Sequence, residues 1–229
     1  STSPHDLMAK GMPELVYWQR TDGVLFSPIP GNCKDELPGQ MLASVGYYGF
    51  WNYYMNTGDR KMVEEVYPAV KKYLALWTTD DTGLTELRKG GWTWGDWGDN
   101  RDLRLIMAGW HHIALKGAAE MADLLGYTED AALYRQTMAR VKDGYNRCWN
   151  GYAYRHPSYH QHTDDRAQAL AVISGIAGEA KYPRILQLLK SQFHASPYFE
   201  QYVMEAPCVI GQETYARERT RKRFPQMVH

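Results

Sequence analysis

Two kinds of helical pattern alternate along this chain, and this alternation most constrains its fold. In the amphipathic kind, apolar residues recur every three or four positions, as at Tyr134, Met138, Val141 and Tyr145. In the other kind, as in segment 102–125, apolar residues surround the helix and small residues are frequent. A helix that is apolar on every side is buried on every side, and small side chains allow neighbouring backbones to approach closely. We therefore expect helical hairpins whose buried inner helices are covered by amphipathic outer helices.

The alternation runs through nine expected helices. The amphipathic ones are 5–18, 62–77, 128–148, 183–193 and 212–224, and the buried ones are 38–56, 102–125, 165–178 and 197–210. Such an order is typical of an all-α toroid or of a helical solenoid. A solenoid would show a fixed repeat of about 34 or 40 residues, which this sequence lacks. The pattern favours an all-α helical toroid.

Several residues are expected to interrupt these helices. Pro68 lacks a backbone donor, so a kink or a restart is expected at Tyr67, and Pro207 is expected to break or bend the helix at 197–210 near its end. Short strands are expected at 83–88 and 151–155, where β-forming residues stand beside glycine.

Composition excludes several classes of protein. The 229 residues are enough for one large domain with a sizeable core, and 26 Lys and Arg balance 26 Asp and Glu. This balance argues against a nucleic-acid-binding protein, which needs a basic surface. No apolar run approaches the roughly 20 residues of a membrane span. Cys33, Cys148 and Cys208 are far apart and odd in number, so we expect small core residues. The opening STSPHDLMAK leaves periplasmic, secreted and cytoplasmic locations open.

Polar side chains cluster just before the buried helices. Because inner helices of a hairpin ring run in one direction, their N-termini gather on one face. The residues expected on this shared rim are Asp35, Glu36, Asp96, Asp99, Asp164, Asp165, His194 and Glu200. Helix capping is a sufficient role for Asp35, Thr163, Ser196 and Asp102, since Asp, Ser and Thr are common caps.

The segment WTWGDWGDN at 92–100 exceeds what a helix cap requires. Its indoles can stack on the apolar faces of pyranose rings, and its carboxylates can accept hydrogen bonds from sugar hydroxyls. Glycosidases also work with paired carboxylates. We therefore predict a carbohydrate site here, the alternative being a structural plug. The residues expected to bind substrate are Trp92, Trp94, Asp96, Trp97, Asp99, Glu36, Asp165 and His194.

Other titratable residues give weaker signals. His111 and His112 lie in a buried helix and are expected to pack in the core. His156, His160 and His162 lie in a polar loop without the cysteines or the second histidine motif of a zinc site. No phosphate-binding glycine loop and no serine nucleophile elbow is present, so no metal or cofactor is expected. The basic residues expected to form a solvated face of the last helix are Arg217, Arg219, Arg221, Lys222 and Arg223.

Four separated motifs carry a family resemblance. DELPGQMLASVGYYGFW, GDWGDN, TDDRAQALAV and HASPYFEQYVMEA resemble, in order, the six-hairpin catalytic domain of bacterial α-L-rhamnosidases, glycoside hydrolase family 78. The similarity runs along essentially the whole chain. It implies an (α/α)6 barrel and hydrolysis of terminal α-L-rhamnosides with inversion. Gly95, Asp96 and Trp97 match the family's Gly-Asp-Trp triplet, whose Trp would face the sugar.

The sequence departs from a complete family member in two places. The family's general-acid Glu lies upstream of the helix matching 5–18, and its general-base Glu follows the last barrel helix; neither motif occurs here. Nine helices of twelve imply one domain, 1–229, that forms the C-terminal three quarters of the barrel. The resemblance therefore implies that the acid and base lie outside the chain and that hydrolysis by it alone is negligible. We also expect self-association through the open side of the ring.

Three alternatives stay open. One is another six-hairpin glycosidase, of glucoamylase, trehalase or uronyl hydrolase type, although a uronyl site needs cationic partners that the Trp-rich segment lacks. A second is a non-catalytic sugar-binding or purely structural helical ring. A third is a hairpin-barrel sugar epimerase, which requires His111 or His194 to face the cavity. Replacing Asp96 and Trp97 separates sugar binding from a structural role.

Overall fold

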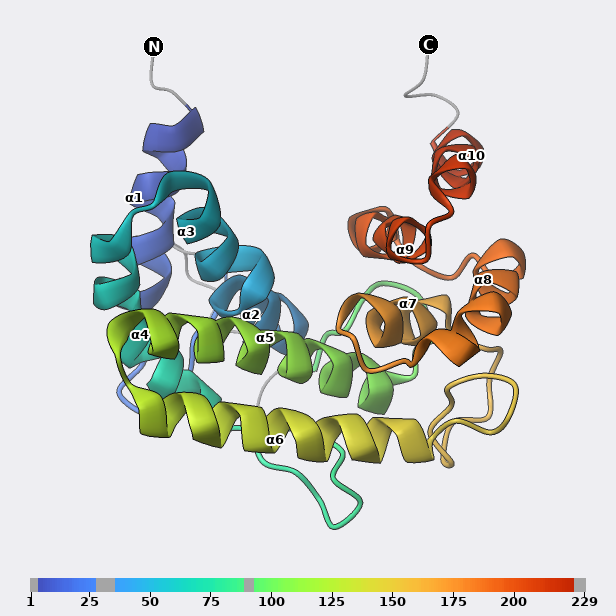
Figure 1. The fold of residues 1–229 in the computed structure, drawn as a ribbon, viewed down its shortest axis with the longest axis horizontal. Helices are drawn as coiled ribbons and strands as arrows, with labels where there is room; N and C mark the ends of the chain where they lie inside the picture. Colours follow the sequence, from blue (N-terminus) through green and yellow to red (C-terminus); the bar gives the residue numbers. More distant parts are fainter. Residues whose placement is uncertain (1–3, 28–35, 89–92, 225–229) are drawn as a thin grey trace.

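The computed structural model describes residues 4–27, 36–88 and 93–224, and within them the chain is helical (Figure 1). The elements are α1 (Pro4–Tyr17), α2 (Pro38–Val45), the π-helical η1 (Tyr47–Trp51), α3 (Asn52–Thr57), α4 (Arg60–Leu74), α5 (Leu103–Leu125), α6 (Thr128–Arg147), α7 (Asp165–Ile173), the 3-10 turn η2 (Glu179–Lys181), α8 (Tyr182–Ser191), α9 (Pro197–Val209) and α10 (Glu213–Arg223). None of these helices is long and apolar enough to span a bilayer.

The helices form two layers in an open arc. In the inner layer, α5 contacts α2 and α7, and α7 contacts α9; in the outer layer, α1, α4, α6, α8 and α10 cover them. Figure 1 shows α1 and α3 at one edge of the opening and α9 and α10 at the other. The predicted all-α ring of helical hairpins, incomplete on one side, is confirmed.

Small residues bring the inner helices together, as predicted. A Cβ on Gly109 of α5 would lie 2.8 Å from the Leu170 Cβ of α7, and one on Gly117 would lie 2.3 Å from the backbone nitrogen of Tyr47. Neither contact is compatible with a real side chain, so the absence of a Cβ permits the close helix packing. These contacts set where the N-termini of α5 and α7 lie relative to each other.

Two helix boundaries differ from the prediction. The expected helix 38–56 is divided at Gly46, whose φ and ψ of −104° and −141° are not helical. A Cβ on Gly46 would lie 2.3 Å from the Ala114 Cα, so the chain bends where it meets α5. The helix at 165–178 ends at Ile173, two residues before Gly175 at φ +77°.

The prolines interrupt the helices less than expected. The predicted restart at Tyr67 is wrong, because α4 runs unbroken through Pro68, which lies on its exposed side. Water can hydrate the carbonyl that Pro68 leaves unpaired, while the apolar stripe packs on both sides of it. Pro207 does not break α9 either, since the helix continues to Val209.

The expected strands reduce to single bridges. Thr79 pairs with Thr85, and Trp149 pairs with Tyr154, so segments 83–88 and 151–155 each contribute only one bridge. Cys148 is buried as predicted, Cys208 is exposed against the prediction, and Cys33 lies outside the described residues.

Candidate functional site

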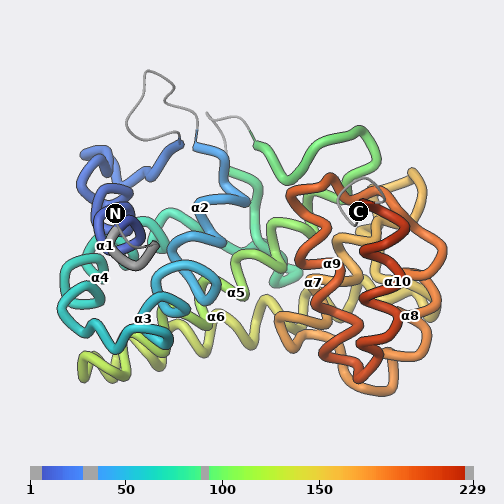
Figure 2. Tube along the Cα trace, turned by 90° about the horizontal axis from the view of Figure 1, so that it is seen from above, coloured from blue at the N-terminus to red at the C-terminus, as the bar shows by residue number. Residues whose placement is uncertain are grey.

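Loops from distant parts of the sequence meet at the N-terminal ends of the inner helices. Figure 2 shows the segment that precedes α5, in green, reaching across to the start of α9. The Asp96 carboxylate accepts a hydrogen bond from the Ser196 backbone nitrogen at 2.8 Å and another from the Ser196 hydroxyl. The Asp102 backbone nitrogen donates to Asp164 at 2.8 Å, joining the start of α5 to the start of α7. The predicted shared rim therefore exists for these segments.

Arg166, in the first turn of α7, lies at the centre of this rim and is fully buried. Its Nη1 donates to the Asp96 carboxylate at 2.8 Å and to the Trp97 carbonyl at 3.1 Å. Its Nε donates to Asp164 at 2.8 Å, and its Nη2 donates to the Asn100 carbonyl. A guanidinium suits this position because its donors lie in a fixed planar fork.

Arg219 of α10 forms a second buried cluster beside the first. It donates to Asp165 at 2.8 Å and pairs with Glu200 through Nε and Nη2, and the three side chains are inaccessible to solvent. The other oxygen of Asp165 accepts a hydrogen bond from the His194 backbone nitrogen at 3.3 Å. The prediction that Arg219 belongs to a solvated basic face is wrong, because two buried carboxylates attract it inward.

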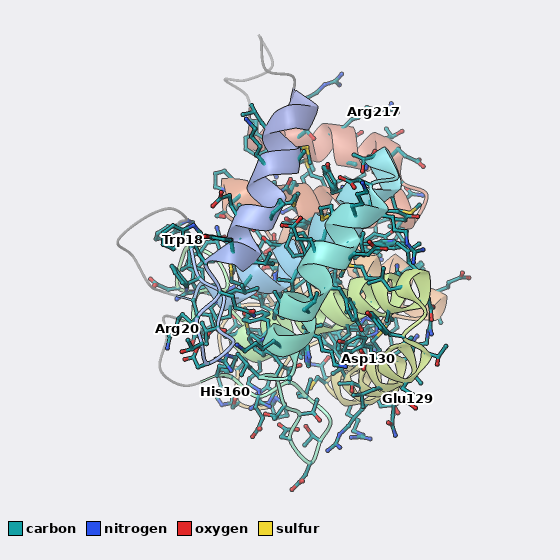
Figure 3. All side chains as sticks on the ribbon, turned by 90° about the vertical axis from the view of Figure 1, so that its left-hand side faces the viewer. Trp18, Arg20, Glu129, Asp130, His160 and Arg217 are labelled. Carbon is teal, nitrogen blue, oxygen red and sulfur yellow. The ribbon has the colours of Figure 1, made fainter. Side chains whose placement is uncertain are left out.

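Two other arginines of α10 differ from Arg219. Arg217 and Arg221 are exposed, as predicted. Figure 3 shows Arg217 on α10 at the edge of the molecule, far from the loop that carries His160. α10 is therefore anchored by two inward-facing arginines, because the half-buried Arg223 lies 3.3 Å from the Glu200 carboxylate and also donates to the Ala195 carbonyl.

The Trp-rich segment divides into a buried part and an exposed part. Trp94 and Asp96 are buried, whereas Trp97 is 60% exposed and Asp99 is also exposed. The Trp94 and Trp97 rings meet edge to face, with centroids 6.0 Å apart, and Trp94 also contacts Tyr198 at 5.4 Å. The exposed indole of Trp97 thus rests on a fixed aromatic neighbour.

A shallow polar pocket of about 400 Å³ lies beside this exposed part. Its lining residues are Asp99, Asn100, His160, Gln161 and His162. The His162 ring stacks on that of His194, with centroids 6.0 Å apart and an interplanar angle of 12°. No group of three or more His, Cys, Asp or Glu in the described parts of the chain has the geometry of a metal site.

Three residues predicted for the site or its rim lie elsewhere or cannot be placed. Glu36 is buried beside α4, where its carboxylate accepts hydrogen bonds from the Tyr73 hydroxyl at 3.0 Å and from Arg88 at 2.8 Å. Burial is the main cause of a pKa of Tyr73 well above its ordinary value. Trp92 and Asp35 lie outside the described residues.

The capping predictions are confirmed at two positions and wrong at a third. Ser196 caps α9 by accepting from the Phe199 nitrogen at 3.3 Å, and Asp102 caps α5. The cap of α7 is Asp164, not Thr163. Because Asp164 can both cap the helix and pair with Arg166, Thr163 is left to accept a hydrogen bond from Arg155 at 3.0 Å.

Burial controls the electrostatics of this face. It raises the pKa of Asp164 to about 6, although Arg166 acts in the opposite direction. It lowers the pKa of His111 to about 3 and that of His112 to about 4, so both rings are neutral near pH 7. His111 contacts the Thr85 hydroxyl at 2.9 Å, which confirms the predicted core packing.

The buried carboxylates of this face are engaged in ion pairs. Asp96, Asp164, Asp165 and Glu200 are buried and each pairs with an arginine. Paired in this way, they hold the loops in place, while Trp97 and Asp99 are left exposed. Sequence reasoning missed the two arginines as central residues, since nothing local distinguishes a buried arginine from a solvated one.

Comparisons with known proteins agree with this fold. A family model described as the bacterial α-L-rhamnosidase six-hairpin glycosidase domain matches residues 4–196. No curated protein sequence matches the chain significantly. The solved family 78 rhamnosidase of Bacillus sp. GL1 is 20% identical with a TM-score of 0.79, over 98% of this chain and 25% of that chain. The α-L-rhamnosidase of Dictyoglomus thermophilum is 19% identical with a TM-score of 0.73, and the match covers 93% of this chain and 26% of that chain.

A third solved structure is a complex with a sugar. It is the Streptomyces avermitilis α-L-rhamnosidase complexed with L-rhamnose, 18% identical with a TM-score of 0.62, over 92% of this chain and 21% of that one. The chain thus spans about a quarter of the length of the solved structures it resembles. At such identities the likeness concerns the fold, which is that of a six-hairpin ring.

Proposed function

Because this chain belongs to the bacterial α-L-rhamnosidase six-hairpin glycosidase domain family, we propose that it contributes the sugar-binding face of a glycoside hydrolase catalytic domain acting on terminal α-L-rhamnosides. The observation that carries the proposal is the exposed Trp97, held on a rigid loop at the N-terminal ends of the inner helices. An indole with one face open to solvent suits the apolar face of a deoxy sugar.

The side chains of the rim take different parts in this proposal. Trp97 stacks on the sugar, and Asp99 accepts hydrogen bonds from its hydroxyls. Trp94 supports the Trp97 ring, while Asp96 and Asp165 hold the loops in place through their arginines. His194, half-buried behind His162, borders the same face. Trp92 and Glu36 stay sequence predictions for substrate binding, although Glu36 is occupied by Tyr73 and Arg88.

Hydrolysis needs groups that this face does not offer. An inverting glycosidase uses two carboxyl groups about 6.5–9.5 Å apart with a water between them. Of the buried carboxylates of the described rim, Asp96, Asp164 and Glu200 are held in arginine pairs, and Asp102 accepts hydrogen bonds from backbone nitrogens. We expect the chain alone to hydrolyse aryl α-L-rhamnosides negligibly, as measured by phenol release. Robust turnover that tracks the purified chain would contradict this part of the proposal.

A tryptophan-fluorescence titration tests sugar binding. L-rhamnose should give a saturable change, and D-glucose and D-glucuronate should not. Trp97→Phe should abolish the change, whereas Trp18→Phe, which removes an indole that is 47% exposed directly after the end of α1, should leave it intact. A response to glucose or glucuronate in place of rhamnose would favour another six-hairpin glycosidase. No response to any sugar would favour a purely structural ring.

The open side of the arc supports a proposal of self-association. Leu7 and Met8 of α1 are 62% and 47% exposed, and an apolar cavity of about 780 Å³ lies between α1, α2, η1 and α9. Contiguous apolar surface of this kind marks interaction sites. We propose that residues 1–229 form one domain, equivalent to the C-terminal three quarters of a six-hairpin ring, and that copies pair through this open side.

Sedimentation velocity over a range of concentrations tests the pairing. Wild-type protein should shift toward a larger species as concentration rises, and Met8→Glu should stay monomeric. Met55→Glu is the matched control, because Met55 is 65% exposed but lies on α3 outside the cavity. A wild-type monomer at every concentration would refute self-association without touching the proposed sugar site.

A further inference from the structure

The loop that carries Trp97 is held by the buried Arg166 side chain of α7. We propose that Arg166 is a positioning residue: it fixes the 96–100 loop so that the Trp97 indole is presented to the sugar. This inference rests on the proposed function, because it concerns the same binding face.

The contacts of Arg166 are concentrated on that loop. One guanidinium donates to the Asp96 carboxylate, to the Trp97 carbonyl and to the Asn100 carbonyl, which together span both ends of the loop. Its Nε is held by Asp164 at the start of α7. The loop therefore takes its position from α7 through one rigid, planar group.

Burial separates this role from direct sugar contact. Arg166 is 0% exposed, so its effect on a ligand must pass through the loop. The Trp97 carbonyl that it binds belongs to the residue whose side chain is 60% exposed. A shift of the backbone at this carbonyl moves the indole directly.

The same loop is anchored a second time at α9. Asp96 receives two hydrogen bonds from Ser196 in addition to that of Arg166. Asp96 thus joins the Trp97 loop to the starts of both α7 and α9. Removing the arginine would release the Trp97 and Asn100 carbonyls while Asp96 stays attached to α9, so the loop would pivot rather than detach.

Lysine cannot reproduce this arrangement. Its ammonium is a compact point charge on a flexible stem, whereas the arginine fork meets a carboxylate and two carbonyls in one plane. Arg166→Lys keeps the buried positive charge for Asp96 and Asp164 but loses the geometry that holds the loop. The effect of this variant therefore reports positioning more than loss of charge.

Arg219 provides a matched control. It is 1% exposed, also pairs with two buried carboxylates, and also donates to backbone carbonyls, those of Leu189 and Gln192. None of its contacts reaches residues 96–100. Arg219→Lys should thus cost stability in a similar way without moving Trp97.

The experiment compares Arg166→Lys with Arg219→Lys in three measurements on the whole chain. The midpoint temperature of thermal unfolding should fall by a similar amount in both variants. L-rhamnose affinity should fall about tenfold or more in Arg166→Lys, because small misplacements of binding groups have large effects, and less than about twofold in Arg219→Lys. The emission of Trp97, obtained by subtracting the spectrum of the matching Trp97→Phe protein, should change only in Arg166→Lys.

The outcomes are separable. Equal loss of affinity in both variants, or wild-type affinity in Arg166→Lys, would overturn the positioning role. If wild-type protein bound no rhamnose, the proposed function would fail, and the Trp97 emission would still decide whether Arg166 positions the loop. If Arg166→Lys did not fold, Asp96→Asn would replace it, since it weakens the same anchor from the loop side. Unchanged Trp97 emission in Asp96→Asn would then refute the proposal.

Discussion

Arg219→Met should destabilise the protein strongly, because it leaves the buried Asp165 without a cation and leaves the buried Glu200 with only the half-buried Arg223. Asp165 and Glu200 are both fully inaccessible to solvent, and both pair with Arg219. The Arg219 Nη2 lies 2.8 Å from the Asp165 carboxylate. Breaking a buried ion pair by removing one partner costs about 3–5 kcal/mol. With Asp165 left unpaired and Glu200 left with Arg223 alone, we expect the loss in the free energy of unfolding to lie within that range.

Urea unfolding followed by tryptophan fluorescence measures this loss. With a urea dependence of about 3 kcal/mol per molar for a chain of this size, the midpoint should fall by roughly 1–1.7 M. Arg217→Met is the control: it removes an exposed arginine two residues away on the same helix. Its midpoint should be nearly that of wild type.

A loss of less than about 1 kcal/mol in the free energy of unfolding of Arg219→Met would refute this expectation, because an ordinary substitution costs that much. A variant with Asp165→Asn, Glu200→Gln and Arg219→Met together adds a second test. It contains none of the three buried charges, so it should recover part of the loss of the single variant. A triple variant that is less stable than Arg219→Met would show that the carboxylates stabilise the fold by another route.

Three further predictions concern packing, pH and capping. Gly117→Ala should lower the thermal midpoint by the equivalent of about 1–3 kcal/mol, since its Cβ would lie 2.3 Å from a backbone nitrogen of η1; Gly178→Ala, with no atom within 4 Å, should not. The pKa of His111 is lowered to about 3 and that of His112 to about 4. The free energy of unfolding should therefore fall as pH drops from 6.5 toward 4, by up to about 1.4 kcal/mol per histidine per pH unit. A His111→Asn, His112→Gln double variant whose urea midpoint showed the same decline would contradict this cause. Ser196→Ala should cost about 1–3 kcal/mol in urea unfolding by removing a helix cap and a buried donor, and Ser196→Thr, which keeps the hydroxyl, should cost clearly less.

The helices and their layering could be predicted from local pattern. Apolar spacing locates a helix such as α6, and the small residues around Gly109 identify an inner helix, because both depend on neighbours within a few turns. The break at Gly46 could not be predicted, since it depends on the close approach of Ala114 from α5. Pro68 was misjudged for a similar reason: its position on the exposed side of α4 decides its effect.

The candidate site was predictable in its location but not in its division of roles. Residues before buried helices did meet on one face, as Asp96 and Ser196 show. Which carboxylates are sequestered depends on long-range partners, because Arg166 reaches back 70 residues to Asp96 and Arg219 reaches back 54 residues to Asp165. A basic run is solvated or buried according to such partners, which local sequence does not reveal.

Sugar binding at Trp97 is the central claim, and nuclear magnetic resonance of the 15N-labelled chain tests it most directly. The Trp97 indole signal is assigned as the one missing from Trp97→Phe, and L-rhamnose is then added. We predict that this indole and the backbone amides of residues 96–100 shift with rhamnose concentration, while the buried Trp110 indole keeps its position. A Trp97 indole that stays fixed at saturating rhamnose, or shifts confined to another part of the chain, would contradict the proposed site.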